Sequence, residues 1–305
     1  MHIFYNDQYT APTYAADTTR KSRLIAEKIG LDKVIDPSWD LVSTIEQICA
    51  VHDLEYIESL QSGLPNYLAE SNNFKWDSGI WSMAINSTAG VLAACETAYR
   101  GLDKLSLPSI ISGSLSSGLH HAHTKGGAGF CTINGLAVAA HAFDDTRITI
   151  LDFDAHCGGG TVEILRNLGI DNRVHQYDIS TNMYDKYRED DNHLIMIADN
   201  NADYIHDVEL TLDYLVDWDN TDLILYNAGV DAYPEISHNT LAHRDELVFN
   251  KCVNTSTPCA FVLAGGYTND QDMDSLVQSH METIYAAQNA GKRPPEGKNR
   301  VHLTA

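Results

Sequence analysis

The sequence predicts an α/β protein with a single, mainly parallel β-sheet and helices on both of its faces. Two observations support this fold class. Short apolar segments of strand length alternate with longer segments of helix length through most of the 305 residues. Polar side chains follow several predicted strands directly, as expected at the ligand-binding edge of such a sheet. Because no internal repeat or second-domain boundary is visible, we predict one domain over residues 1–290 and a polar tail over 291–305.

The N-terminal part of the chain is expected to supply one strand and several helices. Gly30 would end the first helix, and Asp53 would cap the third. The alanines of the longest helix permit close packing against a sheet. In order, the predicted elements are a strand at His2–Tyr5 and helices from Thr18 or Thr19 to Ile29, at Leu41–Val51, at Asp53–Leu60 and at Ile80–Arg100.

Strands and helices alternate over the rest of the chain. Pro108 is expected to begin a strand that runs to Ile111, since proline is tolerated at the first residue of a strand. The polar, glycine-rich stretch Ser112–Gly129 follows, and a loop of that length in a compact domain is usually functional. The later predicted strands are Ile148–Asp152, Arg173–Tyr177, Leu223–Asn227 and Ala260–Leu263, and the later helices are Phe130–Phe143, Val162–Leu168, Asp203–Trp218, His243–Val253 and Met273–Gln288.

Composition limits the classes of partner. The chain carries 20 basic and 42 acidic residues, and its net charge of −22 argues against direct nucleic-acid binding. The charge is compatible with cationic substrates such as lysine side chains or polyamines, although solubility is the simpler explanation. The cysteines are scattered without a CxxC pair, and the N-terminus lacks the pattern of a secretory signal. No apolar run reaches the about eighteen residues of a membrane span. We therefore expect a cytoplasmic protein with reduced thiols and no membrane partner.

Asp152, Asp154 and His156 stand at the end of a predicted strand. Residues two apart on an extended chain point the same way, so all three side chains would line one side of that strand. The glycines at 158–160 then let the backbone turn tightly before the next helix. One interpretation is a site for metal binding or proton transfer. The other is a buried pair of aspartates bonded to backbone amides, with His156 as a cap.

Three further polar segments also follow predicted strands, and they contain His120 and His121, Asp231, and Tyr267. Each has a structural explanation by itself: Asp231 could cap a turn, Tyr267 could pack in the core, and paired histidines could be solvated. Their convergence at one edge of one sheet favours a functional site, because charged groups are rarely buried without partners.

Together these residue types suit the hydrolysis of an amide. Asp154, His156 and Asp231 form a three-ligand set of mixed nitrogen and oxygen donors, which is the pattern of a catalytic zinc with an open position. The metal would activate water, and a nearby histidine would accept the proton. Tyr267 would donate a hydrogen bond to the carbonyl oxygen as it becomes an oxyanion.

The motifs resemble those of the zinc-dependent histone deacetylase family, and most closely its class IV branch. The resemblance extends from Tyr5 to about Tyr285. It implies the arginase/deacetylase fold, with a single eight-stranded sheet, and a deacetylase-like catalytic domain over residues 1–290. The segments that carry it are Leu119–Ala122, Gly127–Cys131, Asp152–His156, Gly229–Asp231 and Gly265–Tyr267, with Tyr226–Gly229 and His243–Phe249 for the class IV branch.

The resemblance also implies a role for each site residue. It places Zn²⁺ on Asp154, His156 and Asp231. Family members often hold K⁺ near the backbone of this strand end, where Asp178 could add an oxygen. The other implied roles are His121 as general base and then acid, His120 as its neighbour held by Asp152, Tyr267 as the group that polarises the carbonyl, and Gly129 and Phe130 as walls of the acyl-lysine channel.

The expected substrate is acylated lysine, with an acetyl or longer fatty acyl group, and acetylated polyamines are the alternative that the charge suggests. A two-manganese ureohydrolase is disfavoured, because Gly158 stands where it would need a carboxylate. Gly159 departs from the family, which usually has Asp or Asn there to orient the base. We therefore expect His121 to lack an obvious partner, and Gly159→Asn to raise activity if base orientation is limiting. A catalytically weak acyl-amine binding module is the alternative from another class.

Overall fold

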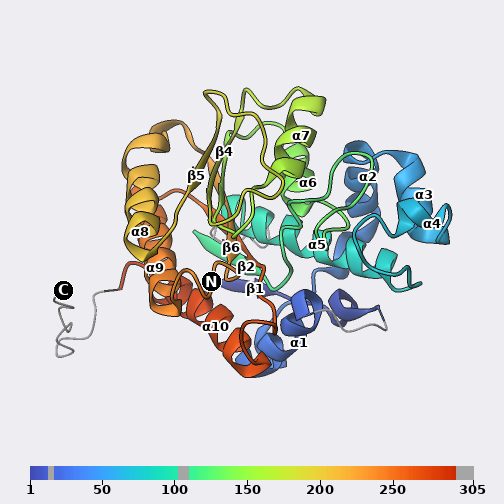
Figure 1. The fold of residues 1–305 in the computed structure, drawn as a ribbon, viewed down its shortest axis with the longest axis horizontal. Coiled ribbons are helices and arrows are strands. Elements are labelled where there is room, and N and C mark those ends of the chain that lie inside the picture. The colour runs from blue at the N-terminus through green and yellow to red at the C-terminus, as the bar shows by residue number, and fades with distance from the viewer. Residues whose placement is uncertain (13–16, 102–109, 293–305) are drawn as a thin grey trace.

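The computed structural model describes residues 1–12, 17–101 and 110–292, and its centre is a parallel β-sheet (Figure 1). Its seven strands lie in the order β1-β2-β7-β6-β3-β4-β5, and every neighbouring pair is parallel. This arrangement confirms the predicted fold class. The strands are β1 (His2–Phe4), β2 (Ile111–Ser114), β3 (Ile148–Asp152), β4 (Val174–Ser180), β5 (His193–Ile197), β6 (Leu223–Gly229) and β7 (Cys259–Ala264).

The expected count of eight strands is wrong for the described residues, which form seven. Beside the edge strand β1, where a further strand could pair, Ile35 makes an isolated parallel bridge to Phe4. Pro37 then leads into a 3-10 turn at Ser38–Asp40. Proline cannot donate to a strand ladder, so pairing at this edge ends after one bridge.

Helices cover both faces of the sheet, as Figure 1 shows. None of the helices in the described part of the chain is long and apolar enough to cross a membrane. One layer consists of α1 (Asp17–Ile29), α8 (Asn201–Leu210), α9 (His238–Thr255) and α10 (Met273–Asn289). The other consists of α2 (Leu41–Val51), α3 (Leu54–Ser62), α4 (Asn66–Ala69), α5 (Ile80–Tyr99), α6 (Gly135–Ala142) and α7 (Gly159–Leu168).

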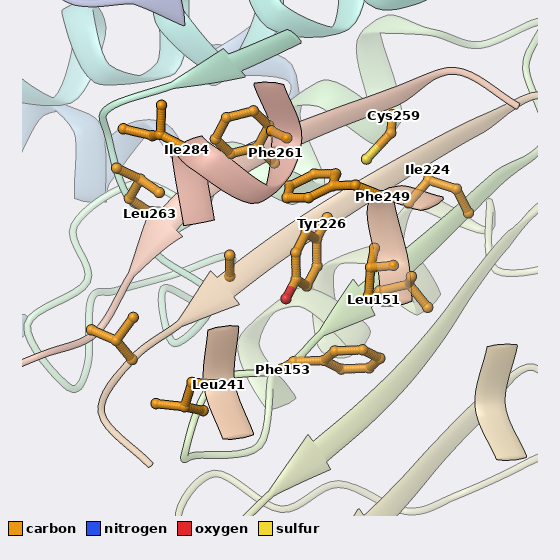
Figure 2. Close-up of a cluster of buried hydrophobic side chains, with 14 of the residues drawn as sticks. Leu151, Phe153, Ile224, Tyr226, Leu241, Phe249, Cys259, Phe261, Leu263 and Ile284 are labelled. Atoms are coloured by element: carbon orange, nitrogen blue, oxygen red, sulfur yellow. The ribbon is translucent and has the colours of Figure 1, made fainter. Parts of the chain in front are cut away.

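Alternate residues of the central strands face the two helical layers. On β6, Ile224 and Tyr226 belong to the core shared with α8, α9 and α10, whereas Leu225 belongs to the core against α5 and α6. Strand geometry requires this two-residue period. Figure 2 shows the first of these cores, where the ring of Tyr226 makes edge contacts with the rings of Phe153 and Phe249.

Most predicted helices and strands are present, with differences at their ends. The helix predicted from Phe130 begins at Gly135, because the Asn134 side chain caps it by accepting from a backbone N–H. Strand β2 runs past its predicted end, and the predicted start at Pro108 lies outside the described residues. Strand β5, which pairs with β4 alone, and the short helix α4 are not among the predictions. Residues 293–305 of the predicted tail also lie outside the described residues, and the boundary at 290 stays a prediction.

The parallel strands bring their carboxyl ends to one edge of the sheet, and this edge positions the candidate site. Each predicted polar segment lies in a loop that leaves this edge. His120 and His121 follow β2, Asp154 and His156 follow β3, Asp231 follows β6, and Tyr267 follows β7.

Candidate catalytic and metal site

Asp154, His156 and Asp231 come together at this edge, although they belong to loops after two different strands. Each offers a ligand atom, and the three atoms lie within 4.8 Å of one another. His156 Nδ1 lies 3.3 Å from Asp154 Oδ1 and 3.3 Å from Asp231 Oδ2. The three residues predicted as a metal-ligand set therefore form a compact cluster.

The charge and hydrogen bonding of this cluster suit a divalent cation. Both carboxylates are buried. Among the described residues, Asp231 Oδ2 is a buried atom without a hydrogen-bond partner of good geometry. Burial lowers the pKa of His156, but Asp154 and Asp231 outweigh it and raise that pKa to about 10. The same concentration of negative charge attracts a cation, and two carboxylates with one imidazole are donors that zinc accepts.

His120 lies beside the cluster and is held by Asp152. The distance from His120 Nδ1 to Asp152 Oδ2 is 2.7 Å, and Asn227 Nδ2 donates to the other oxygen of Asp152 at 2.8 Å. His120 Nε2 lies 3.4 Å from Asp154 Oδ1. Burial disfavours the imidazolium, but the charges of Asp152 and Asp154 raise the pKa of His120 to about 10. His120 therefore carries a positive charge next to the second histidine.

His121 has the opposite electrostatic environment. Burial and the neighbouring charge on His120 lower the pKa of His121 to about 4, although Asp185 opposes both effects. The imidazole is therefore neutral at pH 7 and has a nitrogen free to accept a proton. The two rings are adjacent, with centroids 4.0 Å apart.

The expectation that His121 lacks a partner is wrong. His121 Nδ1 lies 2.9 Å from Asp185 Oδ2. Asp185 is in the connection between β4 and β5, which contains none of the predicted site residues. No motif spacing identifies it, because the contact depends on how that connection folds back over the start of α7.

Tyr267 lines the same pocket as His120, His121, Asp154 and His156. Its ring centroid lies 6.1 Å from that of Phe130. The pocket opens into a cavity of about 340 Å³. The walls of this cavity include Gly129, Phe130, Tyr184 and Tyr267.

Gly129 and Tyr184 both lie close to the ring of His121, beside the entrance to the pocket. A Cβ added to Gly129 would lie 2.5 Å from His121 Cδ2, so a larger residue there would push into the histidine. Tyr184 stacks edge-on against His121 at 4.9 Å and against His156 at 5.9 Å between ring centroids. Tyr184 lines the same cavity as the predicted channel residues Gly129 and Phe130, although no motif in the sequence indicates it.

Arg244 of α9 joins the two loops that carry the buried carboxylates. Its fully buried guanidinium donates from Nη1 to Phe153 O at 2.9 Å and to Gly229 O at 2.7 Å. Asp245 balances its charge at 2.9 Å. Phe153 precedes Asp154, and Gly229 lies two residues before Asp231, so this arginine fixes the relative position of the two carboxylates.

Comparisons with known proteins agree with the fold and the motifs. The histone deacetylase domain model matches residues 20–284. The crystal structure of the HDA15 HD domain superposes with a TM-score of 0.72 at 15% identity, covering 94% of this chain and 91% of that chain. At this identity the likeness concerns the fold, and it confirms the predicted arginase/deacetylase architecture.

Relatives in sequence include proteins of several lineages. An uncharacterised protein of Picosynechococcus sp. is 25% identical over 75% of this chain and 77% of its own length. Histone deacetylase 2 of Arabidopsis thaliana is 29% identical over 50% of this chain and 43% of its own. The acetoin utilization protein AcuC of Staphylococcus aureus is 23% identical over 52% of this chain and 41% of its own. The match thus spans less than half the length of the last two proteins.

Proposed function

Because the chain belongs to the histone deacetylase domain family and is a hydrolase of the deacetylase type, we propose that it removes acyl groups from lysine side chains by zinc-dependent hydrolysis. One observation carries this proposal. Asp154 and His156, which form a cluster with Asp231, line one pocket with a neutral His121 and with Tyr267. These are the groups that amide hydrolysis requires.

Asp154, His156 and Asp231 would hold the zinc ion. The fit rests on the mixed donor set, the two buried carboxylates and the buried Asp231 Oδ2, which has no hydrogen-bond partner of good geometry among the described residues. Zinc bound there supplies Lewis acidity, which activates water and polarises a carbonyl.

His121 would move the proton. A neutral imidazole accepts a proton from the attacking water and later delivers it to the leaving amine, so the same ring serves as base and then as acid. The charged His120 next to it, held by Asp152, disfavours a second positive charge on His121. His121 would therefore release its proton readily to the amine.

Tyr267 would donate its hydroxyl hydrogen to the substrate carbonyl oxygen as negative charge develops there. Gly129 and Phe130 would bind the chain of the acylated lysine at the entrance. Because Gly129 has no side chain, the space beside His121 remains open for the substrate. The substrate amide would thus lie between Tyr267 and His121.

Acetylated polyamine is the second candidate substrate, and the net charge of −22 favours it. Lysine that carries a long fatty acyl group is a third candidate, which the resemblance to the class IV branch suggests. We also propose a cytoplasmic location, from the scattered cysteines. A catalytically weak binding module would retain the pocket, but the partner that His121 finds in Asp185 removes the main argument for it.

We further propose a structural K⁺ near Asp152 and Asp178. Both carboxylates are fully buried. Burial and the charge of Asp152 hold the pKa of Asp178 well above its usual value. A cation at this position would offset the repulsion between the two carboxylates.

A substrate panel with the zinc-loaded full chain tests the function. Acetyl-lysine peptide, myristoyl-lysine peptide and acetylspermidine would be compared at equal concentration, and we expect the highest kcat/KM on an acylated lysine. Asp231→Ala is the matched control, and we expect it to lose both turnover and the metal equivalent measured by elemental analysis. Full metal occupancy in that variant would contradict the ligand assignment. Turnover of acetylspermidine alone would show that the substrate is an acetylated polyamine and not an acylated lysine.

A further inference from the structure

We propose that Asp185 is the residue that positions His121 for proton transfer, and that Gly159 provides the space Asp185 occupies. The inference rests on the proposed function, because positioning has a catalytic meaning only if His121 moves a proton. It assigns a role to the β4–β5 connection, which carries none of the motif residues.

Asp185 makes hydrogen bonds on both of its oxygens. Oδ2 accepts from His121 Nδ1 at 2.9 Å and from Gly160 N at 3.0 Å. Oδ1 lies 3.2 Å from His123 Nε2. An ionised carboxylate can accept but not donate, so His121 must carry its hydrogen on Nδ1. This tautomer leaves His121 Nε2 with the lone pair that a general base needs.

The ionised form of Asp185 is consistent with these contacts. Burial opposes it, but the hydrogen bonds from His121 and His123 lower the pKa of Asp185 to about 2. The side chain is 14% exposed, so the carboxylate is largely shielded from competing water. A shielded acceptor holds one ring orientation more firmly than a solvated one.

The position of Asp185 leaves no space for a side chain on residue 159. A Cβ added to Gly159 would lie 2.1 Å from Asp185 O and 2.6 Å from Asp185 Oδ1. A residue with a side chain at 159 therefore cannot coexist with this position of Asp185. The glycine that departs from the family motif is thus the condition for the contact between Asp185 and His121.

His123 and Glu163 hold Asp185 from the other side. Glu163 Oε2 lies 3.5 Å from His123 Nδ1 and accepts from Thr124 N at 3.0 Å. Glu163 belongs to α7, the helix that begins at Gly159. A continuous series of groups thus links the base to the first turns of α7: His121, Asp185, His123 and Glu163.

The test compares Asp185→Ala and Asp185→Asn with the zinc-loaded wild type and with a control, Asp191→Ala. Asp191 is an exposed residue of the same connection. We expect kcat to fall by roughly 10²–10⁴-fold in Asp185→Ala, as for loss of general acid–base catalysis, with KM within about threefold. Asp185→Asn, whose amide oxygen can still accept from His121 Nδ1, should keep most of the wild-type kcat. Metal content should not change, and the control should match the wild type.

Nitrogen NMR of the histidine rings separates positioning from a merely structural role. We expect the wild-type His121 ring to carry its hydrogen on Nδ1, and Asp185→Ala to lose that preference. If Asp185→Ala does not fold, Asp185→Leu, which fills the space but offers no acceptor, serves for the same measurement. A wild-type tautomer together with wild-type kcat in the folded variant would overturn the proposal.

A reciprocal variant sharpens the test. Asp185→Gly removes the side chain beside residue 159, and adding Gly159→Asn returns an acceptor to His121 from the α7 side once the backbone carbonyl of residue 185, which would lie 2.1 Å from a Cβ at residue 159, has shifted. Recovery of kcat by about tenfold over Asp185→Gly supports the proposal, and an Asp185→Gly variant as active as wild type contradicts it. If wild type turns over no acyl substrate, the proposed function fails, while the NMR comparison still decides whether Asp185 positions His121.

Discussion

The two adjacent histidines of the pocket form similar contacts but differ in charge, since His120 is positive and His121 is neutral. His120 and His121 each place Nδ1 within hydrogen-bond distance of an aspartate, at 2.7 Å and 2.9 Å. Their pKa values are nevertheless about 10 and about 4. The difference shows that one carboxylate contact does not determine the protonation state of a buried histidine.

The surroundings of the two pairs explain the difference. His120 faces Asp152 and Asp154 together, and their combined charge outweighs burial. His121 is buried beside the cation on His120, and Asp185 alone does not offset these two effects. Asp152 lies at the end of a central strand, whereas Asp185 lies in a connection near the surface. The pair of His120 and Asp152 therefore depends on the sheet, and we call it the sheet pair. The pair of His121 and Asp185 is formed by two loops, and we call it the loop pair.

Removing the carboxylate of the sheet pair should have the largest effect. Asp152→Ala leaves His120 buried without its main counter-charge, and breaking a buried pair in this way costs about 3–5 kcal/mol of unfolding free energy. We expect kcat to fall as well, because a neutral His120 no longer discourages the proton on His121. Chemical denaturation and steady-state kinetics measure the two effects. Asp152→Asn, which keeps the shape, is the control, and wild-type stability in Asp152→Ala would show that the pair is not structural.

Tyr267→Phe tests the proposed donor to the carbonyl oxygen, which belongs to neither histidine–aspartate pair. Loss of an oxyanion donor should lower kcat by roughly 10²–10³-fold. The protonation of both histidines should stay as in wild type, since the substitution removes no charge. The pH–rate profile would therefore keep its shape at a lower height. Unchanged turnover would exclude Tyr267 as the group that polarises the carbonyl.

Gly159→Asn should disturb the loop pair without touching the sheet pair. The sequence alone suggests that this change raises activity, but the structure reverses the expectation. The new side chain would collide with Asp185, and overpacking of this kind costs about 1–3 kcal/mol. We expect lower thermal stability and lower kcat, measured by calorimetry and turnover. Gly169→Asn is the control, because Gly169 has open space around it and a positive φ that Asn tolerates. Higher activity in Gly159→Asn would mean that Asp185 moves aside freely.

The smallest expected effect is a pH-dependent loss of stability in His123→Gln. Hydrogen bonds to Asp185 and Glu163 raise the pKa of His123 from 6.5 to about 9. A raised pKa stabilises the folded state fully below 6.5, and this contribution is lost as the pH rises through 9. The difference in stability between wild type and His123→Gln should therefore be largest near pH 6 and fade towards pH 9. Because the side chain is 36% exposed, the effect should be small. A difference independent of pH would contradict it.

Some features follow from residue type and spacing, because their physical causes are local. The α/β class follows from the alternation of segments, and Asp152, Asp154 and His156 share one side of a strand end by the two-residue period of a strand. The helix at Ile80–Tyr99 and the cap at Asp53 also follow from short-range patterns. Parallel pairing then brings the loops after β2, β3, β6 and β7 to one edge. This is why the metal cluster, the paired histidines and Tyr267 could be grouped in advance.

Tertiary structure decided the features that depend on distant segments. The sheet ends at β1, because the segment beside it makes only the bridge between Ile35 and Phe4 before Pro37 leads into a turn. Tyr184 and Asp185 reach the pocket because the β4–β5 connection folds over Gly159. No sequence pattern connects Gly159 with Asp185, because the two residues belong to different segments and come together only in the folded structure. The amino-acid order by itself thus specified which groups meet at the sheet edge, while the folded backbone alone decided which carboxylate holds His121.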